Sequence, residues 1–324
     1  MRPWLLLSAF VVTALLMLPL AAAPKPSPPP PAPADPAVAF LNVGGLKVMN
    51  ADGAAVTTVY TAGFNPTWAP DRSAIGFLVG GSVGSPWELW RIDVTVTNGV
   101  VQGTNPALLY ANVAHLNAST PAWSPTGAVI AFTQVDTDPE TGWSLPRLLR
   151  TIPARGGVPT TLYTTTQGYQ VLDPTWNAAG TKIAWVENDV DMFGEPGWID
   201  PSWAIQVLDL TTGTVSMAFG WVSHSLANLD WSRTQDKIAF STSGGIYTVD
   251  ISQPNPTREL VVGGASQPTW LPDDSKIAFQ ASGRRGPGKV VRGTNIWTYD
   301  FSTGQEALLG PGYAPDWVRC SPCP

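Results

Sequence analysis

The sequence predicts an all-β domain, a six-bladed β-propeller in which one blade is completed by both chain ends. Three observations predict it. A phrase containing Trp and Ile-Ala-Phe recurs five times, and two further strand-like segments follow it. In addition, an Ile-Ala-Phe-like segment without a Trp lies near the N-terminus, and a Trp segment without Ile-Ala-Phe lies near the C-terminus. Four strands in a repeat of roughly 40–55 residues are typical of propeller blades. The 31 glycines, 32 prolines and 13% charged residues suit short strands and tight turns.

Two segments precede the repeats. Residues 1–23 combine Met1-Arg2 with an apolar run from Trp4 to Leu20 and three alanines, which predicts an export signal peptide. Pro24 disfavours cleavage, and the run approaches the roughly 20 residues that span a bilayer, so an uncleaved N-terminal membrane anchor is the alternative. Residues 24–36 predict a Pro-rich extended linker. Both alternatives place the propeller, residues 37–319, in the periplasm or outside the cell, with residues 320–324 as a short tail.

The recurring phrase is Pro-x-Trp or a close variant, followed by Ile-Ala-Phe or a close variant. Its Ile follows the Trp at the same interval in every copy, and the tryptophans are Trp68, Trp123, Trp176, Trp231 and Trp270. Turn-forming residues lie between, as in Ser-Pro-Thr-Gly at 124–127. Each copy therefore predicts a strand, a tight turn and a second strand. A Trp at one offset in every blade indicates packing between blades rather than a stacking surface for ligands.

A second phrase ending in Asp, such as Ile246–Asp250, predicts the third strand, and a short apolar segment such as Leu108–Tyr110 predicts the fourth. The sixth blade is divided between the ends. Trp317 lacks a following Ile-Ala-Phe, and Val38-Ala-Phe40 lacks a preceding Trp. We expect these two segments to pair, because ring closure removes exposed strand edges.

The blade phrase resembles the TolB-type, WD-like repeat family, whose blade reads Pro-x-Trp-Ser-Pro-Asp-Gly, then Ile-Ala-Phe, then Ile-Tyr-x-x-Asp. Trp123-Ser-Pro-Thr-Gly127 with Ile130-Ala-Phe matches it best. The resemblance covers about residues 38–317 and implies the propeller fold. TolB carries a separate domain before its propeller, where this sequence has a signal and a spacer, so TolB's partners are not carried over.

The candidate binding residues lie in connections between second and third strands. These connections share one face with the links between blades, because neighbouring strands run in opposite directions; we call it the long-loop face. The candidates are two acidic groups, a basic loop and nearby tryptophans: Asp136, Asp138, Glu140, Glu187, Asp189, Asp191, Arg284, Arg285, Lys289, Arg292, Trp143, Trp198 and Trp203.

The acidic groups leave three alternatives open: a solvated surface, a calcium site or paired carboxylates for glycoside hydrolysis. As a polarised surface, they should orient a charged partner. Reversing the charges of Glu187, Asp189 and Asp191 is then expected to weaken binding.

No motif predicts a catalytic residue or a cofactor other than calcium. Gly80-Gly-Ser-Val-Gly84 matches a nucleophile elbow, but we expect it in a hairpin loop rather than a strand-to-helix turn. Cys320 and Cys323 are too few for a zinc site. In an oxidising compartment they are candidates for a local disulfide, with two idle thiols as the alternative.

The sequence therefore favours a protein- or peptide-binding module over an enzyme, acting as a monomer with a partner in the cell envelope. The net charge of −6 argues against nucleic acid and anionic lipid as partners. The alternatives are a carbohydrate-binding propeller that uses its loop tryptophans, and a polysaccharide-processing lyase or hydrolase.

After removal of residues 1–36, far-UV circular dichroism should show strands with almost no helix. A helix content above about a fifth would contradict the propeller.

Overall fold

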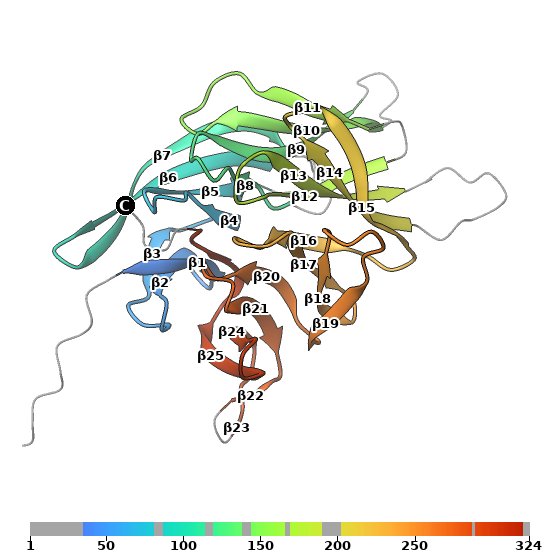
Figure 1. Ribbon diagram of the computed structural model, residues 1–324. Helices are drawn as coiled ribbons and strands as arrows, with labels where there is room; N and C mark the ends of the chain where they lie inside the picture. The colour runs from blue at the N-terminus through green and yellow to red at the C-terminus, as the bar shows by residue number, and fades with distance from the viewer. Residues whose placement is uncertain are drawn as a thin grey trace, which may run out of the picture. The chain divides into compact units, whose positions relative to one another are not determined.

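The computed structural model describes residues 35–80, 87–113, 119–137, 144–165, 169–189, 202–286 and 289–319. These residues belong to the second of two compact units, residues 1–31 and 32–324. They form six four-stranded antiparallel sheets arranged as the six blades of a propeller (Figure 1). The all-β prediction is confirmed. Within these ranges no helix is long and apolar enough to cross a membrane.

Both chain ends meet in one sheet, the composite blade. From the centre of the ring outward its strands are β26 (Tyr313–Trp317), β1 (Pro36–Asn42), β2 (Gly45–Asn50) and β3 (Thr57–Tyr60). Val38 pairs with Trp317, and Ala39 pairs with Asp316. The predicted pairing of the two ends is therefore confirmed.

The other five blades each use consecutive strands. Blade 1 contains β4 (Phe64–Trp68), β5 (Ala74–Val79), β6 (Trp87–Thr97) and β7 (Val100–Val113). Blade 2 contains β8 (Ala122–Trp123), β9 (Val129–Thr137), β10 (Ser144–Pro153) and β11 (Thr160–Thr164). Blade 3 contains β12 (Tyr169–Trp176), β13 (Lys182–Asp189), β14 (Ser202–Asp209) and β15 (Thr214–Val222).

Blade 4 contains β16 (Ala227–Trp231), β17 (Lys237–Thr242), β18 (Gly245–Asp250) and β19 (Arg258–Gly263). Blade 5 contains β20 (Ser266–Trp270), β21 (Lys276–Ser282), β24 (Thr294–Asp300) and β25 (Gln305–Pro311). The hairpin β22 (Arg285–Gly286) and β23 (Lys289–Val290) is inserted between β21 and β24. The innermost strands contact one another around the ring in the order β26, β4, β8, β12, β16 and β20.

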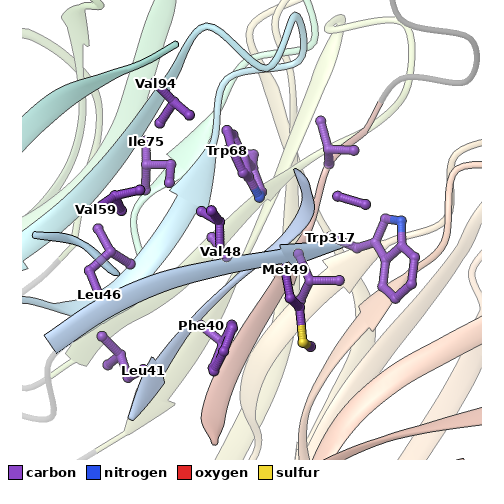
Figure 2. Close-up of a cluster of buried hydrophobic side chains, with 14 of the residues drawn as sticks. Phe40, Leu41, Leu46, Val48, Met49, Val59, Trp68, Ile75, Val94 and Trp317 are labelled. Carbon is purple, nitrogen blue, oxygen red and sulfur yellow. The ribbon is translucent and has the colours of Figure 1, made fainter. Parts of the chain in front are cut away.

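The core lies between neighbouring blades. The five repeat tryptophans and Trp317 are at most 4% exposed. Trp68 of blade 1 packs in one cluster with Phe40 and Met49 of the composite blade (Figure 2). This burial confirms the prediction that the repeated Trp serves packing between blades.

A long hairpin of blade 1 adds a second contact at the ring closure, which the sequence analysis did not predict. Its turn, Asn98-Gly99, has positive φ at both positions, as a two-residue type I′ hairpin requires. Val94 and Val101 of this hairpin are buried with Val59 of β3. A Cβ at Gly103 would collide with the Val59 carbonyl oxygen, so this close approach needs glycine.

Deleting residues 314–324 should unfold the ring or lower its melting temperature sharply, because the composite blade loses its innermost strand. Loss of the buried Trp317 side chain alone costs about 3–5 kcal/mol. Thermal unfolding followed by circular dichroism measures the effect, and deletion of residues 320–324 is the matched control. Equal melting temperatures for the two truncations would contradict closure by β26.

Candidate functional site

Glu187 is not in a surface loop, so its predicted placement is wrong. Pairing between β12 and β13 continues to Tyr169 and Asp189, which extends the strand beyond the repeat pattern. Glu187 is 6% exposed, and its Oε2 accepts hydrogen bonds from Tyr163 Oη and Trp185 Nε1, each at 3.3 Å. Burial and this carboxylate raise the pKa of Tyr163 to about 12. Charge reversal at Glu187 would therefore disturb the core instead of reporting on a partner.

Other predicted positions are also strand residues. Asp136 lies in β9 and Asp189 ends β13, so their placement in loops is wrong as well. Trp203 lies in β14 and packs, half-buried, on the core between blades 3 and 4. Seven predicted residues lie outside the described ranges: Asp138, Glu140, Trp143, Asp191, Trp198, Cys320 and Cys323.

The predicted basic loop is partly neutralised. Arg284 forms an ion pair with Glu306, and its guanidinium lies 5.2 Å from the centre of the Phe279 ring. Arg285 and Lys289 belong to the short hairpin β22–β23, and Arg292 is exposed. Within the described ranges, no three His, Cys, Asp or Glu side chains are grouped to hold a metal ion. The calcium alternative therefore stays a prediction about the loop residues.

The innermost strands surround a narrow cavity of about 50 Å³ on the ring axis. At roughly 10–15 Å³ for each water, it holds only a few water molecules, whereas small-molecule sites measure roughly 300–1,000 Å³. Polar and charged side chains from around the ring line it: Asn65, Thr67, Thr120, Asn228, Asp230, Gln267, Thr269, Asp316 and Arg319.

A repeated β-bulge shapes the cavity mouth. Three residues before the Trp, φ lies between 45° and 54° in five of the six blades, and the strand register shifts at the same place. These residues are Asn65, Asp173, Asn228, Gln267 and Ala314. Backbone strain of this kind often marks a functional site. Because it recurs in five blades, we interpret it here as a structural feature of the propeller that bends these five innermost strands.

The residue before each Trp joins one blade to the next. In five of six joints its side-chain oxygen accepts a hydrogen bond from the Trp backbone N of the following blade. The pairs are Trp68 N to Asp316 Oδ2 (2.6 Å), Trp123 N to Thr67 Oγ1 (3.3 Å), Trp231 N to Thr175 Oγ1 (3.0 Å), Trp270 N to Asp230 Oδ2 (2.7 Å) and Trp317 N to Thr269 Oγ1 (3.1 Å).

The sixth joint, between blades 2 and 3, is different. Ala122 has no side-chain oxygen, and Trp176 Nε1 donates instead to the Ala122 carbonyl oxygen at 3.1 Å.

A buried charge network closes one end of the cavity. Asp230 accepts two hydrogen bonds from Arg233, both 2.9 Å, and one from Arg319 at 3.0 Å. Arg319 follows β26, yet its Nη1 also donates to the Trp176 carbonyl oxygen at 3.3 Å, in the blade diametrically opposite. Arg319 therefore crosses the ring axis where the innermost strands end. The other end of the cavity is lined by residues near the start of these strands, on the long-loop face, such as Asn65, Gln267 and Ala314.

The carboxyl group of Asp316 titrates near neutral pH. Burial raises its pKa to about 7, and Asp230 adds to the rise, while Arg319 and the Trp68 N–H oppose it. Burial and the neighbouring Arg233 lower the pKa of Arg319 to about 10. The joint between the composite blade and blade 1 thus contains an acid that is costly to ionise.

Four apolar side chains, which we call the aromatic rim, lie on the long-loop face: Val43, Phe64, Trp87 and Tyr313. Of these, Phe64 and Tyr313 directly precede the cavity-lining residues Asn65 and Ala314. Phe64 and Tyr313 are 41% and 39% exposed, and each begins an innermost strand in adjacent blades. The Trp87 ring meets the Phe64 ring edge-on, with centroids 5.0 Å apart. Val43, in the turn between β1 and β2, is almost fully exposed.

Val43, Phe64, Tyr313 and the charge network were not predicted from the sequence. Phe64, Tyr313 and the network could have been found by comparing equivalent positions between repeats. Four residues before the Trp, the other four blades have Ser119, Leu172, Ala227 and Ser266. One residue before it, two blades have Asp where the others have Thr or Ala.

Comparisons with known proteins support the fold. No protein-family model and no curated protein matches the sequence. TolB from Acinetobacter baumannii is similar in structure, with a TM-score of 0.58 and 16% identity over 87% of this chain and 66% of that chain. A putative TolB from Agrobacterium tumefaciens has a TM-score of 0.52 and 16% identity, over 86% of this chain and 91% of that chain.

A chain of a nidogen/laminin complex gives a TM-score of 0.60 and 9% identity over 88% of this chain and 98% of that chain. At these identities the comparisons show a shared propeller fold. The match spans slightly less than two thirds of the Acinetobacter TolB chain.

Replacing Asp316 by Asn should remove a pH dependence of stability. A raised folded-state pKa means that the wild type loses stability as pH rises from about 4 to 7. The amide can still accept from Trp68 N but does not titrate. Relative to Asp316→Asn, the free energy of unfolding of the wild type should therefore fall over this range, as measured by denaturant titration at each pH.

Asp273→Asn is the control for this measurement. The Ser275 hydroxyl holds the pKa of Asp273 below its ordinary value, so its difference from wild type should stay flat from about pH 5 to 7. Parallel wild-type and Asp316→Asn curves would contradict the assignment.

Proposed function

We propose that this protein is an extracytoplasmic binding module for a protein or peptide, and that it binds through the aromatic rim on the long-loop face. The observation that carries the proposal is the pair of exposed aromatic residues, Phe64 and Tyr313, on adjacent innermost strands at the cavity mouth. Exposed aromatic residues are common anchors in protein interfaces.

The size of the axial cavity supports surface recognition over catalysis in a chamber. Its volume is about 50 Å³, and Arg319 crosses the end opposite the mouth. A substrate of ordinary size would need several times this volume. A partner that lies across the mouth needs no such space.

The rim is held in place before any partner arrives. Phe64 begins a strand whose next residue, Asn65, is fixed in the β-bulge, and Trp87 packs edge-on against the Phe64 ring. In the turn beside them, the Val43 N–H donates to Asn42 Oδ1, while Asn42 Nδ2 donates to the Pro311 carbonyl oxygen. Preorganised anchors bind with less loss of side-chain entropy.

The apolar run from Trp4 to Leu20 supports a location outside the cytoplasm, as a signal peptide or as an anchor. A partner in the cell envelope would then have access to the long-loop face. The same rim favours a carbohydrate as the second candidate ligand, because sugar rings also stack on aromatic side chains.

Replacing both Phe64 and Tyr313 by Ala should weaken partner binding by roughly 10- to 100-fold, since interface anchors each contribute about 1–2 kcal/mol or more. Both side chains are already partly exposed, so the melting temperature should change little. Affinity for a partner captured from envelope extract is measured by surface plasmon resonance. Leu260→Ala, which removes an exposed apolar side chain from the outer strand β19, is the control.

A photo-reactive phenylalanine analogue at position 64 identifies the class of partner. Cross-links to a protein support the first proposal. Saturable quenching of Trp fluorescence by oligosaccharides, lost in the double variant, supports the second. Equal affinity of the double variant and the wild type would contradict the rim as the binding site.

A further inference from the structure

The side chain of one buried arginine, Arg147, has no hydrogen-bond or ion-pair partner among the described residues. Arg147 lies in β10 of blade 2 and is 5% exposed. Leu149, two residues later, is buried in one cluster with Ile183 and Trp185 of blade 3. Since alternate residues of a strand point to the same side, the Arg147 side chain also enters the layer between blades 2 and 3, near its long-loop end.

Within the described residues, the Arg147 guanidinium makes no ion pair and no side-chain hydrogen bond. Arg147 Nη1 is buried without a hydrogen-bond partner, and none of the ion pairs in the described part of the chain includes Arg147. Burial lowers its pKa. The Thr133 hydroxyl is likewise buried and unpartnered. Thr133 is opposite Leu149 in the ladder, so it faces the same layer.

Arg150, on the other side of the same strand, has acceptors for both of its terminal nitrogens, although its Nε is buried without a partner. Its Nη1 donates to Gln134 Oε1 at 2.6 Å and to Tyr110 Oη at 3.2 Å, and its Nη2 donates to the Pro159 carbonyl oxygen at 3.2 Å. Arg147 therefore stands out among its neighbours.

A buried guanidinium without an acceptor is costly, and native proteins usually satisfy such a group with a protein atom, a water or an ion. Glu187 is the acid of the same layer, but its Oε2 accepts from Tyr163 and Trp185. Arg147 contributes donors only, and Thr133 contributes a hydroxyl that can donate as well. The complementary ligand is an acceptor with a negative charge.

We propose that Arg147 and Thr133 form a binding site for a carboxylate at the long-loop end of the layer between blades 2 and 3. A carboxylate is planar and accepts two parallel hydrogen bonds from a guanidinium. It suits a layer between two packed sheets better than the tetrahedral sulfate or phosphate does. This site is separate from the aromatic rim and does not depend on the proposed function.

The test is acetate titration of the full-length protein at constant ionic strength, with chloride as the replaced anion. The wild-type melting temperature should rise saturably, on the order of 2–4 °C at acetate tenfold above its dissociation constant. Arg147→Met should abolish the rise. Arg155→Met, which removes an exposed cation from a turn of the same blade, should retain it. No rise in the wild type, or the same rise in Arg147→Met, would overturn the proposal.

A second readout distinguishes a ligand site from an internal partner. In chloride alone, Arg147→Met should be at least as stable as the wild type, because it removes an uncompensated buried charge. A melting temperature several degrees lower would show that the guanidinium already has a partner in this chain, and it would overturn the proposal.

Two further anions identify the source of the carboxylate. Polyglutamate acting at a much lower carboxylate concentration than acetate, in an Arg147-dependent way, supports an acidic segment of a partner. Acetate acting alone supports a small free carboxylate. A sulfate response equal to that of acetate and retained in Arg147→Met would indicate a general salt effect and overturn the site.

Discussion

One type of hydrogen bond holds the ring together at its centre. The donor is the backbone N–H of a repeat tryptophan, and the acceptor is a side-chain oxygen of the preceding blade, from the residue just before that blade's own tryptophan. Thr67, Thr175 and Thr269 accept it at three joints, and Asp230 and Asp316 at two. It satisfies a buried N–H that the blade's own ladder leaves free. Because it joins neighbouring blades at five of the six joints, it also constrains how these blades are oriented around the cavity.

At two joints the acceptor is an Asp, where three other joints have Thr, and this places carboxyl groups near the axis. Buried carboxylates need compensation, and Asp230 receives it from Arg233 and Arg319. Asp316 has only the Trp68 N–H as a direct donor among its described contacts, and burial keeps its pKa near 7. Residues 313–319 therefore serve two purposes: β26 completes the composite blade, and Arg319 closes the short-turn end of the axis.

The inner strands hold the ring together, and the long-loop face carries the features that differ from blade to blade. The aromatic rim and the Arg147 layer both lie toward this face, but they differ in chemistry. The rim presents preorganised apolar surface, whereas the Arg147 layer presents buried donors without acceptors.

The sequence alone determined the fold, because the constant Trp-to-Ile interval and the divided sixth phrase can be recognised without knowing how the loops are arranged. It also determined that the repeated tryptophans are core. It did not determine the site. Glu187 reads as a loop acid in the sequence, and it is buried only because β12 and β13 pair beyond the repeat. Phe64 and Tyr313 are 249 positions apart and become neighbours only when β26 closes the ring beside β4. Nothing in the sequence distinguishes Arg147 from other strand residues, and its Nη1 is buried only because blade 3 packs against blade 2.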